Sequence, residues 1–275
     1  MRVYRLILAA LLAAPVVASA QPASRPAPGR VAPPAKPKKV DVDKARAALL
    51  GADAAKAAQA ATELGGSKDA AAHAALLDAL ATGLHPDVAA AALAALAAAP
   101  AKDDVATVRP YARHRNGRVR AAAVRALAAH DGTGADVLAA LRDQDVDVRA
   151  AAAEAAARGK VKGATEPLLA LFDKGELAAG LALGSVADAD LARVIAEHLG
   201  TPPDGVMAQT LGVILKRPEF GPEPARVQVV RTLAKLAGPE AITVLGDYVD
   251  ATPAKPPRQS RREAEVALKQ KLGGE

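Results

Sequence analysis

The sequence predicts an all-α protein, an α-solenoid of about six helix-turn-helix repeats, from three observations. The first is that four stretches of similar sequence follow one another, namely His85–Ala99, Asn116–His130, Asp145–Arg158 and Gly175–Val186. Anchored on Val88, Val119, Val148 and Leu177, they lie 31, 29 and 29 residues apart. Self-similarity at this period is typical of solenoids, in which each unit buries its apolar face only against its neighbours.

The second observation is helical spacing within each copy. In Asn116–His130 the apolar residues recur at i, i+3, i+4, i+7 and i+8, as Val119, Ala122, Ala123, Ala126 and Leu127. These positions share one face of an α-helix, and the same positions are apolar in the copies before and after. The stretch therefore predicts an amphipathic helix with Leu127 in the core.

The third observation is a second helical run after each copy, separated from it by Gly, Pro or Asp. These runs are Asp103–His114, Gly134–Arg142, Ala164–Asp173 and Asp188–Leu199. Less regular pairs flank them, as Ala52–Leu64 with Lys68–Leu80 and Pro222–Ala237 with Pro239–Val249. We therefore expect the solenoid over residues 41–250, a Pro-rich linker over 251–257 and a charged capping helix, Gln259–Leu272, within 258–275.

One interval breaks the period. Ala225 and Arg226 resemble the Val119–Arg120 position, yet Ala225 follows Leu177 by 48 residues, too many for one unit. The excess contains the apolar run Asp204–Lys216, which we interpret as an inserted helix or a degenerate half-repeat.

The N-terminus is typical of an exported protein. Residues 1–20 read as a signal peptide, with Arg2 and Arg5 before an apolar run and Ala18-Ser19-Ala20 at the cleavage point. Residues 21–40 are rich in Pro, Lys and Arg and predict a disordered linker. The apolar run is too short to span a bilayer, and no transmembrane helix is expected elsewhere. The expected location is the periplasm or the exterior of a Gram-negative bacterium.

The charge balance argues against nucleic-acid binding. The chain has 36 Lys and Arg against 30 Asp and Glu, but residues 1–40 hold seven of the bases and none of the acids. The remaining 29 bases face 30 acids, whereas a nucleic-acid reader has its basic excess on the folded surface. Aromatic residues make up only 2% of the chain, so stacking platforms for bases are also missing.

The repeats resemble the HEAT family, in particular the short bacterial HEAT-like repeats also found in phycobilisome lyases. The resemblance rests on Asp87-Val88 with Ala95-Leu96, Val119-Arg120 with Ala126-Leu127, and Asp147-Val148-Arg149 with Ala155-Ala156. It covers roughly residues 52–250, and Ala89 departs from it where the family usually has Arg. The resemblance implies an α-solenoid with a binding role rather than one particular activity.

The best candidate for a contact surface is a cluster of arginines between two repeats. The segment 109–125 holds six arginines and no acid, and Arg109, Arg113, Arg115 and Arg118 are the candidate partner-binding residues. Arg120 and Arg125 lie deeper in the repeat helix and are expected to be structural. The alternative is that the arginines pair with acids of adjacent units, as in the repeat-to-repeat Asp–Arg ladders common in this family.

The sequence patterns for metal and catalytic sites are weaker. Asp143–Glu154 has the ligand spacing of a calcium loop, but Val148 stands where Gly is needed, so a turn and helix cap is preferred. The five histidines show no zinc-site spacing, and the His-Glu dipeptides that hold iron in the HEAT-like deoxyhypusine hydroxylase do not occur. The chain has no cysteine and no G-x-S-x-G serine, so neither a cofactor, a metal nor a catalytic nucleophile is expected.

These observations predict a non-enzymatic scaffold or adaptor of the bacterial cell envelope that binds protein partners, acidic ones included. Two alternatives stay open. One is a lyase- or hydroxylase-like enzyme subunit that uses the concave groove of the solenoid, and the other is a tether that holds envelope polymers through the basic linker.

Overall fold

The computed structural model describes residues 40–273, which belong to one compact unit. The predicted signal peptide (1–20) and, except for Val40, the predicted linker (21–40) lie outside the described residues. Nothing in the structure therefore bears on these two predictions.

Within residues 40–273 the secondary structure is helical throughout. The first helices are α1 (Val42–Leu49), α2 (Ala54–Gly65), α3 (Ala70–Thr82), α4 (Pro86–Ala98), α5 (Asp104–Val108) with the 3-10 helix η1 (Arg109–Arg113), α6 (Gly117–Leu127) and α7 (Gly134–Ala140). The others are α8 (Val146–Arg158), α9 (Thr165–Asp173), α10 (Leu177–Val186), α11 (Ala189–Glu197), α12 (Asp204–Lys216), α13 (Glu223–Lys235), α14 (Pro239–Ala251) and α15 (Gln259–Leu272).

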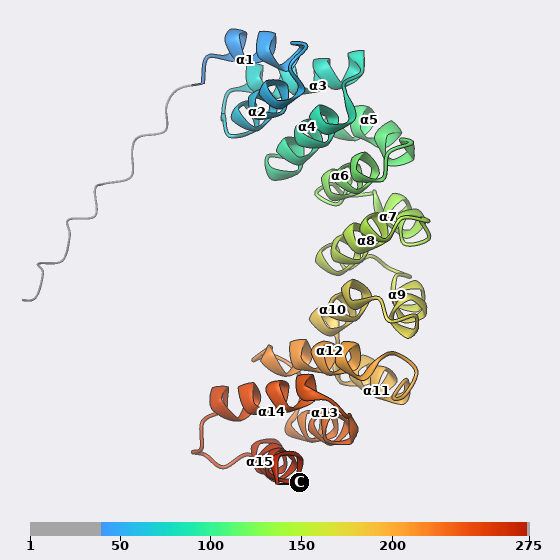
Figure 1. Ribbon diagram of the computed structural model, residues 1–275, viewed down its shortest axis with the longest axis vertical. Coiled ribbons are helices and arrows are strands. Elements are labelled where there is room, and N and C mark those ends of the chain that lie inside the picture. The colour runs from blue at the N-terminus through green and yellow to red at the C-terminus, as the bar shows by residue number, and fades with distance from the viewer. Residues whose placement is uncertain (1–39, 274–275) are drawn as a thin grey trace, which may run out of the picture. The chain divides into compact units, whose positions relative to one another are not determined.

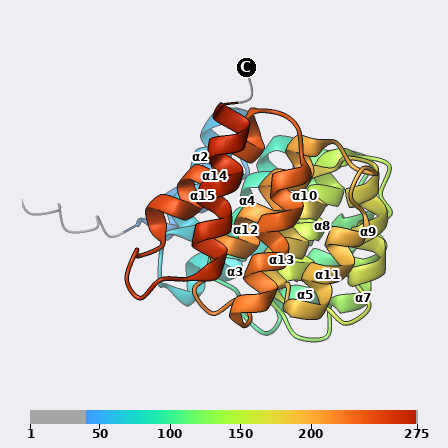
Figure 2. The ribbon, with the colours of Figure 1, turned by 90° about the horizontal axis from the view of Figure 1, so that it is seen from below.

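The helices of this unit alternate between two layers. The inner layer consists of the even-numbered helices α2 to α14, each stacked on the next, and lies on the inside of the curved stack (Figure 1). The outer layer holds the odd-numbered helices, and a view along the stack shows α7, α9 and α11 together on one side, with α4, α8, α10 and α12 beside them (Figure 2). The predicted all-α solenoid is confirmed.

Short polar side chains begin several of the helices. Asp53, Asp69, Asn116 and Asp145 each accept a hydrogen bond from a backbone N–H in the first turn of the helix that follows. Such caps satisfy donors that have no partner inside the helix, and they fix where each turn ends. The Asp or Asn at these turns thus marks where these four helices begin.

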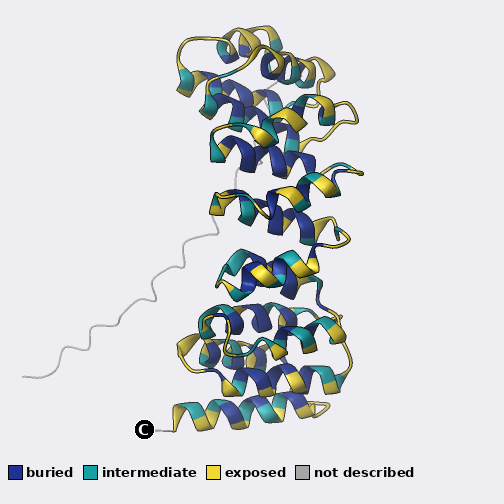
Figure 3. Cartoon of the chain, turned by 90° about the vertical axis from the view of Figure 1, so that its right-hand side faces the viewer, coloured by how far each residue is buried: buried dark blue, intermediate teal, exposed yellow. Residues whose placement is uncertain are grey.

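Small residues let the layers approach closely. The core is mostly alanine and leucine, with Leu127 fully buried as predicted, and buried positions recur along the stack while exposed ones concentrate in the turns (Figure 3). Gly180 and Gly184 bring α10 against α12, because a Cβ at Gly184 would lie 2.7 Å from the carbonyl oxygen of Thr210. This contact requires the glycine.

Of the two interpretations of Asp204–Lys216, the inserted helix is wrong and the degenerate half-repeat agrees with the structure. This segment is α12, which lies in the inner layer between α10 and α14 and starts 27 residues after α10. The match of Ala225–Arg226 to Val119–Arg120 is also wrong, because α13 belongs to the outer layer and packs against α11 and α15. The described residues therefore hold seven helix pairs followed by α15, where about six units were expected.

Candidate functional site

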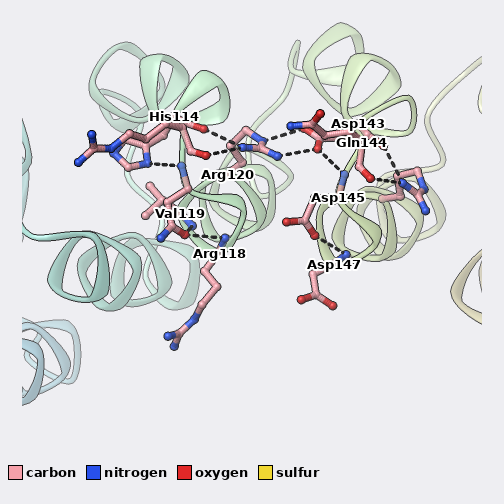
Figure 4. A network of polar contacts seen from close by, with 11 residues as sticks. His114, Arg118, Val119, Arg120, Asp143, Gln144, Asp145 and Asp147 are labelled. Atoms are coloured by element: carbon pink, nitrogen blue, oxygen red, sulfur yellow. Dashed lines mark hydrogen bonds and ion pairs between the residues drawn. The ribbon is translucent and has the colours of Figure 1, made fainter.

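A ladder of arginines joins consecutive repeats at the N-terminal ends of the inner helices (Figure 4). Arg120, only 8% exposed, donates to both carboxylate oxygens of Asp143 in the next repeat, at 2.7 and 2.8 Å. Its remaining Nη1 donates to the carbonyls of His114 and Arg115, at 2.9 and 3.2 Å. The guanidinium thus ties the turn before α6 to the turn before α8.

The following repeat copies this arrangement. Arg149 donates to Glu176 through Nε and Nη2, at 2.8 and 2.7 Å, and through Nη1 to the carbonyls of Asp143 and Gln144, at 2.8 and 2.9 Å. The hydrogen bond from Arg120 lowers the pKa of the Asp143 carboxyl and raises that of the guanidinium. Arg120 and Arg149 are therefore structural, as the ladder alternative predicts for Arg120.

The calcium-loop spacing of Asp143–Glu154 has a structural explanation. Asp143 is held by Arg120, Asp145 caps α8 by accepting from the Asp147 N–H, and α8 runs from Val146 to Arg158. A chain that is helical from Val146 onward cannot wrap an ion. The turn-and-cap interpretation describes this segment.

The four predicted contact arginines have two kinds of surroundings. Arg109 pairs with Asp136 at 3.2 Å, and Arg118 pairs with Asp87 at 3.0 Å, both with exposed side chains. Arg113 ends η1, Arg115 lies in the turn before α6, and both are exposed. Neither has an ion pair with an acid in residues 40–273. These two arginines are therefore the candidate contact residues whose charge is available to a partner.

Sequence reasoning expected a concave groove but did not place it over particular helices, and the structure has one on the inner layer. It has a volume of about 830 Å³ and lies over α8 and α10, with Arg125 of α6 and the turn after α12 at its edges. Its floor is apolar and is formed by Ala150, Ala157, Ala178, Leu181 and Val186. Leu181 is 37% exposed and is the exposed large apolar side chain that lines this groove.

Charged side chains surround this floor. They are the cations Arg125, Arg158, Lys160 and Arg217 and the anions Glu154 and Glu219. Arg125 was expected to be structural, but its side chain is 47% exposed and its Nε lies 4.0 Å from Glu154. Arg158 pairs with the same glutamate, so one carboxylate serves two guanidinium groups.

Arg217 is held more firmly than the other cations. Its Nη1 donates to the carbonyls of Gly184 and Ala187, at 3.1 and 2.7 Å, and its Nε donates to Glu219 at 2.8 Å. It therefore fixes the end of α10 against the turn after α12. The hydrogen bond from Arg217 lowers the pKa of the Glu219 carboxyl.

A second groove adjoins the first. It has a volume of about 510 Å³, lies over α10, α12 and α14, and shares Leu181 with the first groove. Its edge carries an ion pair between Lys216 and Asp247, at 3.2 Å. The two grooves thus follow one another along the inner layer, with the exposed leucine between them.

A buried carboxylate in the N-terminal repeats joins three helices. Asp104 is 0% exposed, accepts from the Ala101 N–H at 2.8 Å and lies 2.6 Å from the His73 ring. His130, after α6, lies 3.7 Å from its other oxygen. Within residues 40–273 no cluster of His, Cys, Asp and Glu has the arrangement of a metal site, so we assign this group to packing between repeats.

The part of the chain that holds the ladder matches a known family. Residues 73–157, from α3 to α8, match the family model of HEAT repeats. This segment carries HEAT repeats. The grooves over α10, α12 and α14 lie mostly beyond the matched HEAT segment, in repeats whose sequences are less regular. The narrower resemblance to the repeats of phycobilisome lyases stays a prediction.

The chain is also similar to a crystal structure of an engineered protein. The two are 24% identical, the alignment covers 86% of this chain and 98% of the other, and the TM-score is 0.34. No curated protein matches the chain. Among the described helices, none combines the length and the apolar character needed to cross a membrane.

Proposed function

We propose that this HEAT-repeat protein is a non-enzymatic scaffold that binds protein partners through its inner layer, within the bacterial cell envelope. The observation that carries the proposal is the pair of adjoining grooves that share the exposed Leu181. An apolar floor with a charged edge is the arrangement of a protein–protein contact surface, where a buried apolar centre is surrounded by a polar rim. HEAT repeats commonly serve as such scaffolds.

Site-specific photo-crosslinking in the native host tests the binding role. A photoreactive amino acid in place of Leu181 should give a discrete covalent adduct with another protein. The control replaces Leu50, which is also exposed but lies in the turn after α1, away from the grooves. A contact surface on the inner layer would be contradicted if no adduct formed at position 181, or if positions 181 and 50 gave the same adducts.

The envelope location rests on the sequence of residues 1–20. N-terminal sequencing of the protein purified from its host should begin at Gln21, after the Ala18-Ser19-Ala20 motif. Protein that begins at Met1 and fractionates with the cytoplasm would remove this part of the proposal and leave the binding role intact.

A further inference from the structure

We infer that the groove over α8 and α10 binds an acidic protein segment that places an apolar side chain against Leu181. This inference rests on the proposed scaffold function and names the chemistry of the partner. It follows from two independent properties of the groove, the composition of its floor and the surplus of cations at its edge.

The floor selects an apolar contact. The run Leu177–Ala187, which contains all of α10, has no charged residue, and its side chains meet the alanines of α8 in the groove. Because Ala150, Ala157 and Ala178 are short, a bound segment can approach the helices closely. Leu181 and Val186 are the large apolar side chains available for contact, and burying them gives the segment its anchor.

The edge selects negative charge. Four cations face two anions here, and Glu154 is already shared by Arg125 and Arg158. Lys160 is exposed and makes no ion pair with any residue in the described part of the chain. Carboxylates of a bound segment would therefore meet the unpaired Lys160 ammonium and two guanidinium groups that share one carboxylate, beside the apolar floor.

Charge also decides against the chain's own N-terminal segment as the occupant. Residues 1–40 hold seven basic residues and no acid, so the edge of the groove repels them. A segment of another protein that alternates acidic and apolar side chains satisfies both the floor and the edge.

Two labelled peptides of about 15 residues, roughly four turns of helix, serve as probes. In one peptide, Leu residues recur every three or four positions on one helical face and Glu residues occupy the other face. The second peptide has the same Leu positions and carries Lys at every Glu position. Fluorescence anisotropy with the full chain measures their binding. We expect the Glu peptide to bind, the Lys peptide not to bind, and the affinity for the Glu peptide to fall as the salt concentration rises.

Variants locate the binding. Replacing both Arg125 and Lys160 by Glu should weaken binding of the Glu peptide by about tenfold or more, since two exposed charge contacts are reversed. L181A should weaken it severalfold. The matched control K44E/K68E changes the net charge equally at two exposed lysines outside the groove, and it should leave the affinity unchanged.

The thermal midpoint of each variant checks its folding. If R125E/K160E does not fold, R125Q/K160Q removes the same two charges and keeps long polar side chains at both positions. Equal binding of the two peptides, or equal loss from the groove and control variants, overturns the inference. Self-association of the chain that L181A abolishes would identify a second copy as the occupant and also overturn it.

Two different measurements test the acidic segment and the scaffold function, so one can fail without the other. Crosslinking at position 181 reports any protein partner, whatever its charge. An adduct there with no preference between the peptides would keep the scaffold and reject the acidic segment.

Discussion

Arg120 and Arg125 lie on the same helix five residues apart, and their guanidinium groups have different surroundings. Arg120 points to the turns at the start of the helix, where two carbonyls and a carboxylate surround it. Arg125 lies about one turn and a half further along the helix, where its exposed side chain lies at the edge of the inner groove. The local sequence predicts which arginines lie outside the apolar face of the helix, but it does not predict which groups their side chains contact.

The ladder should contribute strongly to stability. Replacing Arg120 by Ala removes the bidentate pair with Asp143 and leaves a largely buried carboxylate and two carbonyls without their donor. We expect a loss of about 2–4 kcal/mol in the free energy of unfolding. Urea unfolding measures it, and R118A, which loses only an exposed pair, should change it by about 1 kcal/mol or less. Equal losses in both variants would contradict the ladder.

The same pair predicts a dependence on pH. The pKa of Asp143 is lowered in the folded protein from its ordinary value of 3.8 by the hydrogen bond from Arg120. The ionised carboxylate thus stabilises the fold above about pH 4, and this contribution is lost as the pH falls through the folded pKa. The gap in unfolding free energy between the wild type and D143N should therefore narrow below about pH 4. A gap that stays constant down to acidic pH would contradict this assignment.

Arg113 and Arg115 form the part of the predicted contact surface that has no ion-pair partner among the described residues. Reversing both to Glu should leave the thermal midpoint nearly unchanged, because exposed charges contribute little to stability. If this turn touches a partner, the reversal should weaken binding of a partner identified by crosslinking and reduce its salt dependence. Binding and salt response identical to those of the wild type would limit the partner surface to the inner layer.

At the scale of elements, the regular repeats could be predicted and the irregular ones could not. Val119 and Val148 lie in helices that have both the apolar face and the Arg of the ladder. The repeat period and the alignment of these repeats can therefore be determined from the sequence. In α10 and α12 the positions of Arg120 and Arg149 hold uncharged residues, and glycines replace part of the stripe. The register is lost there, which is why the sequence of α12 leaves an inserted helix and a degenerate half-repeat both open.

The position of the groove was missed for a related reason. Arg125, Lys160 and Arg217 span 92 residues of sequence, and only the stacking of repeats brings them to one edge. The local signal that could have found it is the uncharged run Leu177–Ala187, in which Leu181 does not belong to the buried stripe. An exposed leucine in an uncharged helix is the feature to seek in related repeats.

The close packing of α10 on α12 predicts an unusual response to alanine. Alanine stabilises an exposed helix position by about 1 kcal/mol relative to glycine. At Gly184 the added Cβ would meet the carbonyl oxygen of Thr210 at 2.7 Å, so G184A should instead destabilise the protein by about 1–3 kcal/mol. In α14, a Cβ added at Gly246 would meet no atom within 4 Å, so G246A should be neutral or stabilising. Thermal unfolding of both variants checks the contrast.

For the molecule as a whole, the last helix protects the end of the stack. Ser260 of α15 donates to Glu223 through its backbone N–H and its hydroxyl, at 2.8 and 2.7 Å, and the hydroxyl also contacts the Tyr248 phenol at 2.7 Å. Arg231 of α13 pairs with Glu263 of α15 in a bidentate contact. These contacts and the burial of Ala264 and Ala267 hold α15 across α13 and α14.

Removing α15 should therefore expose an apolar surface. A chain that ends before Gln259 leaves Tyr248 and the facing surface of α13 open to solvent, as in a solenoid without its terminal cap. We expect this chain to aggregate or to bind a hydrophobic dye, measured by size-exclusion chromatography and dye fluorescence. A monodisperse, dye-negative product would show that the stack ends stably at α14.

The described unit contains two hydrophobic clusters, and α6 contributes to both. Leu127 and its neighbours close the cluster that starts at Ala45, whereas Ala121 and Val124 face the one that extends to Ala267. During synthesis the first cluster is complete once Leu127 has emerged, but the second waits for nearly the whole chain. The two halves therefore differ in how long their apolar surfaces stay uncovered, and the later half, which carries the grooves, is exposed to aggregation for longer before it folds.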